Sequence, residues 1–173
     1  LMCKQDLLMN SLSSFFRIEE NICSILPIIN GKSNISLRIL DWFVTNYAKK
    51  NNISYNVYDK KKNMMKKFIV HIDYKSQLKA YSKKQFDPFC RRERLVFTDI
   101  NNNDIITTAG QLNFFRWAIQ NKVIEYAKEN VVRIEKDMND SIQCRKDTNM
   151  RVRNKRRKDA STIIQQYPQG VTF

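Results

Sequence analysis

The sequence predicts an α+β protein in which a small antiparallel sheet, made of two hairpins, is covered by helices. A long C-terminal helix and a basic tail complete this prediction. Apolar residues recur every three or four positions in several stretches, which is typical of amphipathic helices. In other short stretches apolar and polar residues alternate, which is typical of strands. In chain order the elements read α-α-β-β-α-β-β-α, and the predicted α+β domain covers residues 10–142.

The N-terminal part predicts two helices. We interpret residues 1–9 as an extension and place the first helix at residues 10–26, where Pro27 would stop it because proline lacks a backbone N–H. The second helix is expected at residues 35–49, with Ser33 or Asn34 as its N-cap. Apolar residues spread beyond one face of this second helix, so we expect it to be buried on more than one side.

Two hairpins follow. Alternation over residues 53–58 and 68–74 predicts two strands, and His71 would be a structural side chain of the second. The loop between them is rich in lysine, and it is either a solvated turn or a phosphate-binding finger: Lys60, Lys61, Lys62, Lys66 and Lys67. Residues 95–98 and 105–107 predict the second hairpin, with three asparagines at its turn.

The longest helical pattern runs from Thr107 to Met138. Thr108 and Gln111 have the spacing of a capping box, which would satisfy backbone N–H groups at the start of this helix. Phe115 and Trp117 lie in its first turns, so we expect them to be among the most buried side chains. This helix has the features of a scaffold and shows no catalytic pattern.

A segment at residues 75–94 mixes basic and aromatic residues. It predicts a short helix that ends at Asp87, because the residue before Pro88 avoids the α region. The aromatic residues could stack on bases while the basic ones neutralise phosphates, or the segment could dock on an acidic protein. A third interpretation places the aromatic residues in the core and the charges at its rim. The candidate contact residues here are Lys83, Lys84, Arg91, Arg92 and Arg94.

The amino-acid composition of the chain changes from Gln143 onward. Residues 143–173 are interpreted as a basic tail that is extended, disordered when free, and ordered by a partner. Residues 145–158 hold eight Lys or Arg and one Asp, a balance of +7 out of a net charge of +14. The candidate contact residues are Arg145, Lys146, Arg151, Arg153, Lys155, Arg156, Arg157 and Lys158. The apolar end, residues 170–173, could add a strand to a neighbouring sheet edge.

Recognisable catalytic patterns do not stand out. His71 is the sole histidine, and the three glycines leave little room for a phosphate-binding loop. The four cysteines have no short spacing of the kind that zinc sites use, so we expect no metal and no cofactor. No apolar run approaches the length that spans a bilayer. We therefore expect a protein that is not an enzyme, although an active site assembled from distant residues stays open.

The net charge of +14 favours anionic partners, namely nucleic acid, an acidic protein surface or anionic lipid. Outside the tail, an AT-rich genome is an equally good explanation for the abundance of lysine and asparagine.

Three segments resemble a little-characterised family of proteins from nucleocytoplasmic large DNA viruses, which infect algae and protists. They are NISLRILDWFVTNYAKKNN at 34–52, QLKAYSKKQFDPFCRRERL at 77–95 and TTAGQLNFFRWAIQNKVIEY at 107–126. The resemblance implies a viral source and a role in late transcription, genome handling or virion structure. It supplies no catalytic or binding residues.

Two functional hypotheses follow. The first is a non-enzymatic virion structural protein, a minor capsid or capsid-associated component that binds other virion proteins in a large assembly. The second is a basic DNA-binding factor for late viral transcription or genome packaging. Either protein would be made in the host cytoplasm or the viral factory, and the first would be located in the virion.

Overall fold

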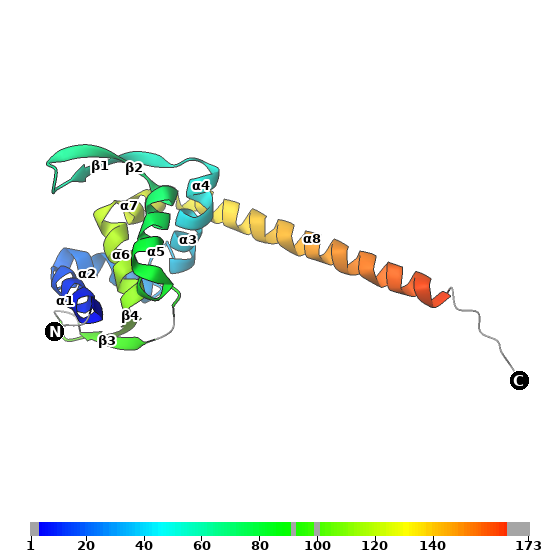
Figure 1. The fold of residues 1–173 in the computed structure, drawn as a ribbon, viewed down its shortest axis with the longest axis horizontal. Helices are drawn as coiled ribbons and strands as arrows, with labels where there is room; N and C mark the ends of the chain where they lie inside the picture. Colours follow the sequence, from blue (N-terminus) through cyan, green and yellow to red (C-terminus); the bar gives the residue numbers. More distant parts are fainter. Residues whose placement is uncertain (1–3, 91–92, 99–100, 166–173) are drawn as a thin grey trace, which may run out of the picture. The chain divides into compact units, whose positions relative to one another are not determined.

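The computed structural model describes residues 4–90, 93–98 and 101–165, and for 159–165 the backbone alone. Its contacts divide the chain into two units, Leu1–Glu135 and Lys136–Phe173, which are described separately. The first unit contains helices and two separate two-stranded antiparallel sheets among its described residues (Figure 1). The α+β class is confirmed, but the two hairpins do not join into one sheet. The first unit ends before the predicted boundary at residue 142.

Helices α1 (Lys4–Phe16) and α2 (Glu19–Ile29) replace the single predicted helix at 10–26. The Asn21 side chain donates to the carbonyl of Phe15 and so satisfies the end of α1. Helix α1 starts at Lys4, and its Ser11 hydroxyl accepts from Arg116 in a later helix. Within the stretch interpreted as an extension, Leu8 of α1 is buried.

The prediction that Pro27 stops α2 is wrong, because the helix continues to Ile29. Proline removes only one hydrogen bond in this last turn, and its carbonyl accepts from the N–H groups of Lys32 and Ser33. The chain turns at Gly31, whose φ of 68° lies in the left-handed region that glycine adopts without steric cost.

The second predicted helix is present as three consecutive segments: α3 (Leu37–Trp42), a π-helical turn η1 (Phe43–Tyr47) and α4 (Ala48–Lys50). Its N-cap is Ser36, whose hydroxyl accepts from the N–H of Ile39, and not Ser33 or Asn34. Phe43 is fully buried, and its ring stacks on Tyr126.

The first hairpin pairs β1 (Ser54–Asp59) with β2 (Met64–Ile69). The predicted strand at 68–74 is wrong beyond Ile69, because Val70 begins α5 (Val70–Phe86), which also contains His71. Val70 and Tyr74 are both buried, and their spacing of four residues fits either a strand or a helix. In a strand Ile72 would share their face, but it is 52% exposed. Burial therefore follows the helical period.

Helix α5 has a break at Ser82 and ends before Pro88, as predicted. The second hairpin pairs β3 (Arg94–Thr98) with β4 (Asp104–Thr108), which confirms that prediction too. In Figure 1, the two hairpins lie on opposite sides of the packed helices of the first unit.

The long helix predicted at 107–138 is divided into α6 (Ala109–Gln120), α7 (Val123–Glu129) and α8 (Val131–Gln165). Each interruption begins with an asparagine. The side chains of Asn121 and Asn130 donate to the carbonyls of Trp117 and Tyr126, four residues earlier, and so satisfy the helix ends. Lys122 takes a left-handed conformation between α6 and α7.

The predicted cap of α6 is confirmed, because the Thr108 hydroxyl accepts from the N–H of Gln111. The Gln111 side chain accepts instead from the hydroxyl of Thr107.

The core lies where α5 packs against α6. Phe115 and Trp117 are buried, as predicted, and the Trp117 indole N–H donates to Asp73 of α5 at 2.7 Å. Gly110 allows the close approach, since a Cβ there would lie 2.9 Å from the carbonyl oxygens of Lys84 and Asp87. Both hairpins are connected directly to these two helices, since β2 runs into α5 and β4 runs into α6.

Candidate nucleic-acid interface

The cationic segment, residues 145–158, lies within α8 and is helical. This corrects the expectation of an extended tail. Lysine and arginine are good helix formers, and α8 contains no glycine or proline, so the backbone has no local reason to leave the helix. The side chain of Gln143 also bonds Asp147 one turn later, at 3.0 Å. Composition alone indicated an extended tail because it does not weigh these local preferences.

The helix arranges the basic residues on two arcs. With 3.6 residues per turn, five of the eight fall within an arc of about 120°. These five form the arginine face: Arg145, Lys146, Arg153, Arg156 and Arg157. The remaining three lie on the other side of the helix, within an arc of about 60°. These three form the minor face: Arg151, Lys155 and Lys158. All eight residues could be identified from the sequence, but their division into faces was not predicted.

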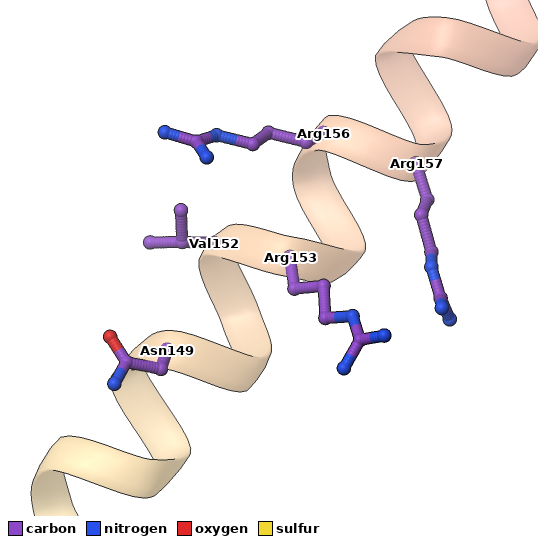
Figure 2. Close-up of a pocket in the computed structure, with 5 residues that line it drawn as sticks. All are labelled: Asn149, Val152, Arg153, Arg156 and Arg157. Carbon is purple, nitrogen blue, oxygen red and sulfur yellow. The ribbon is translucent and has the colours of Figure 1, made fainter.

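The side chains of the arginine face reach outward. Figure 2 shows the guanidinium groups of Arg153, Arg156 and Arg157 extending away from the helix backbone, beside the smaller Asn149 and Val152. All eight basic residues of the segment are exposed. Asn149 and Val152 were missed by the sequence analysis, and extending the helical period through the tail would have placed them on this face.

Repulsion within the segment favours an anionic partner. Arg153 and Arg157 stand one helical turn apart, as do Arg151 and Lys155. Like charges at this spacing destabilise a helix by about 0.2–0.5 kcal/mol per pair. A bound polyanion would remove this cost. An α-helix fits the major groove of DNA, and the guanidinium fork of arginine matches phosphate oxygens.

The other candidate residues lie in the first unit. Lys83 and Lys84 are exposed in the last turn of α5, and Arg94 is exposed at the start of β3. Arg91 and Arg92 lie outside the described residues, as do residues 170–173 with their predicted added strand. Lys83 and Lys84 are therefore neighbours on one turn of the first unit. The cationic segment belongs to the second unit.

The aromatic residues near Lys83 and Lys84 are of two kinds. Phe86 is fully buried and stacks on Tyr81, so for this residue the interpretation as core is correct. Phe89 is 47% exposed and lines a shallow pocket together with Arg94 and Ile106. Phe89 therefore offers apolar surface next to a basic side chain.

The described residues contain no group of three or more His, Cys, Asp or Glu side chains that could hold a metal ion. Asp41 is half-buried, and burial, followed by the charge of Asp87, raises its pKa to about 6. The thiols of Cys23, Cys90 and Cys144 are unpaired. In the part of the chain that the structure describes, no helix is both long enough and apolar enough to cross a bilayer.

These features define a class of protein: a small α+β body followed by a long helix with an exposed cationic segment. The chain belongs to a family of unknown function (DUF7197), whose model matches residues 2–169.

It is also 47% identical, over 131 residues, to the "Uncharacterized protein L507" of Acanthamoeba polyphaga mimivirus. That match covers 73% of this chain and 50% of the relative, so the chain spans about half the length of the curated relative it matches. No solved structure matches the chain significantly. The mimivirus relative supports a viral protein and agrees with the resemblance to a poorly characterised family of large DNA viruses.

Proposed function

We propose that this chain is a non-enzymatic nucleic-acid-binding protein of a large DNA virus, with DNA as its ligand. The observation that carries the proposal is the arginine face, where five exposed cations occupy one side of a regular helix. From Arg145 to Arg157 this face extends about 18 Å along the helix axis. Several phosphates of one duplex lie within such a length. The roles that fit are late viral transcription and genome packaging.

Phosphate neutralisation makes a measurable prediction, because each contact releases counterions. The logarithm of the binding constant should fall by about 0.9 per contact for each tenfold rise in salt. With about five contacts, the affinity should fall by roughly three powers of ten between 50 and 200 mM salt.

A gel-shift salt titration of the full chain, and of a chain ending at residue 142, tests the proposal. Binding should be steeply salt-dependent for the full chain and much weaker for the shortened one. Equal affinity for the two chains, or an affinity that does not change with salt, would show that the cationic segment does not bind DNA.

A second function, a virion structural protein that contacts other capsid proteins, is favoured by a different observation. Val96 and Ile106 form a cross-strand pair on the β3–β4 hairpin, and they are 62% and 67% exposed. With the neighbouring Phe89 they present apolar side chains that a protein partner could cover. This function also agrees with location in the virion after synthesis in the host cytoplasm or the viral factory.

Proteomics of purified, nuclease-treated virions tests this second function. A component that contacts capsid proteins should stay with the particles after the treatment. Absence from purified particles would contradict the virion hypothesis but not the DNA-binding proposal.

A further inference from the structure

The β1–β2 hairpin has an ordered tip. Its two strands pair from Ser54 opposite Ile69 to Asp59 opposite Met64, which leaves a four-residue loop. The Asp59 carboxylate accepts from the N–H groups of Lys61 and Lys62 at 3.0 and 3.3 Å. Asn63 closes the loop in a left-handed conformation, and its side chain accepts from the Tyr58 hydroxyl. The backbone that carries the tip lysines is therefore fixed by local hydrogen bonds.

The base of the hairpin is fixed to the body. The Tyr55 hydroxyl donates to the carbonyl of Asn121 at 2.8 Å, and the Tyr55 ring stacks on Tyr126. Phe68 is buried and packs near Trp117, with ring centroids 6.0 Å apart. The hairpin is therefore an arm with an anchored base and an exposed tip.

The arm is strongly cationic. Residues 54–69 contain five lysines and a single acidic residue, so their balance is +4. All five lysines are exposed: Lys60, Lys61, Lys62, Lys66 and Lys67. The one acid, Asp59, is engaged in the turn. The hydrogen bond from the Lys61 N–H, with a further one from Lys62, lowers the pKa of Asp59 and keeps it in its accepting, charged form.

From these features we propose that the β1–β2 hairpin is a second DNA-binding element, a lysine-tipped β-ribbon that contacts duplex phosphates independently of α8. The proposal adds a site to the proposed function and shares its ligand. A two-stranded β-ribbon is one of the two elements that the major groove admits. Lysine ammonium groups neutralise phosphates at the groove edge. Tyr58 and Met65, an exposed cross-strand pair behind the tip, would face the groove with apolar surface.

The order of residues along the arm argues against a membrane surface as the partner. The exposed apolar side chains of Tyr58, Met64 and Met65 stand on the strands, behind the lysines of the loop. To bury all three in a bilayer, the arm would have to bring the adjacent charged loop to the apolar interior, which is costly.

The test uses the full chain and fluorescence anisotropy with a short, labelled DNA duplex of random sequence. In the hairpin variant, Lys60, Lys61, Lys62, Lys66 and Lys67 are all changed to Gln. The matched control makes the same change at five other exposed lysines of the first unit: Lys4, Lys32, Lys49, Lys75 and Lys128. Both variants lose five charges, so any difference between their affinities for DNA reports the positions of the changed lysines. The hydrogen bonds of the turn use backbone N–H groups and should survive in the hairpin variant.

If three of the five hairpin lysines contact phosphates, the salt slope should fall by about 2.7. The affinity at low salt should fall by about tenfold or more, with a smaller change in the control. If the two variants differ in unfolding midpoint, a variant with only Lys60→Gln, Lys61→Gln and Lys62→Gln is compared with the natural chain. These three changes alter the loop and leave the strands unchanged.

Equal affinities and slopes for the hairpin variant and the control would overturn the proposal and identify a solvated turn. A parallel variant with Arg153, Arg156 and Arg157 changed to Gln separates this result from failure of the proposed function. If that variant weakens binding while the hairpin variant does not, α8 binds DNA and the arm does not. If only the hairpin variant weakens binding, the arm binds DNA and the proposed role of α8 is wrong. Hairpin-dependent flotation with phosphatidylserine vesicles, without hairpin-dependent DNA binding, would identify a membrane surface and overturn the proposal.

Discussion

Phe115 is fully buried in α6, and its ring meets that of Phe114 edge to face at 6.0 Å. Replacing it with alanine removes this packing and leaves a cavity, which typically costs about 3–5 kcal/mol. A domain of this size has only about 5–15 kcal/mol of stability. We expect Phe115→Ala to lower the urea midpoint strongly or to prevent folding. Val132→Ala is the control, because Val132 is 75% exposed. A midpoint for Phe115→Ala equal to that of the control would place the core on another face of α6.

Asp41 makes stability depend on pH. Its pKa is raised from 3.8 to about 6 in the folded state, by burial and then by the charge of Asp87. Between these two values the folded protein keeps a proton that the unfolded chain has released, so the free energy of unfolding falls as pH rises. Above about pH 6 the folded state holds an unfavourable, partly buried carboxylate.

We expect Asp41→Asn to remove this dependence. Urea denaturation at several pH values should show the stability of the variant rising relative to the natural chain from pH 4 to pH 7. Parallel curves for the two proteins would mean that Asp41 ionises in the folded state as it does in the unfolded chain.

Single residues also show where sequence reasoning succeeds and where it fails. Burial of Phe115 and Trp117, and the cap at Thr108, follow from local patterns, and the structure confirms them. The limit of β2 could not be predicted in this way. Val70 and Tyr74 fit both a strand and a helix, and only the exposure of Ile72, which depends on tertiary packing, decides between them.

At the scale of elements, hydrophobic periodicity indicated helical content correctly but not where helices end. The stripe from 107 to 138 is continuous, yet Asn121 and Asn130 divide it into three helices. An asparagine side chain that bonds a carbonyl four residues earlier is a local event that hydrophobic spacing does not register. In the cationic segment, the candidate site could be predicted from its charge. Its helical form and its two faces were found only in the structure.

Helix α8 should be separable from the body beyond Ile142. Every described residue of α8 from Gln143 to Lys158 is exposed, so these residues bury little apolar surface to offset their conformational entropy. We expect a chain ending at residue 142 to unfold cooperatively, at nearly the midpoint of the full chain. Misfolding of the shortened chain would show that residues 143–173 pack on the body and support its fold.

The helicity of the cationic segment should respond to anions. Because Arg151 repels Lys155 and Arg153 repels Arg157 across one helical turn, screening by salt or neutralisation by duplex DNA should stabilise this part of α8. Circular dichroism of the full chain should show a gain in helical signal on adding either, and the chain ending at 142 should show much less. The same gain in both chains would place the response in the body.

In the molecule as a whole, positive charge is concentrated in two elements. Half of the net charge of +14 lies in fourteen residues of one helix, and another +4 lies in the β1–β2 hairpin. Net charge alone would attract any polyanion, whereas binding through the arginine face requires particular positions. Composition predicted an anionic partner. It could not predict which side of the helix would meet that partner, because the division into faces depends on the helical period.

Binding of nucleic acid by the arginine face is tested by comparing variants of the two faces of α8. One variant changes Arg153, Arg156 and Arg157 to Gln, and the other changes Arg151, Lys155 and Lys158 to Gln. Both remove three charges from the same helix. Anisotropy titrations with duplex DNA at several salt concentrations should show a salt slope lower by about 2.7 for the first variant and a clearly smaller change for the second. Identical slopes and affinities for the two variants would contradict an organised arginine face.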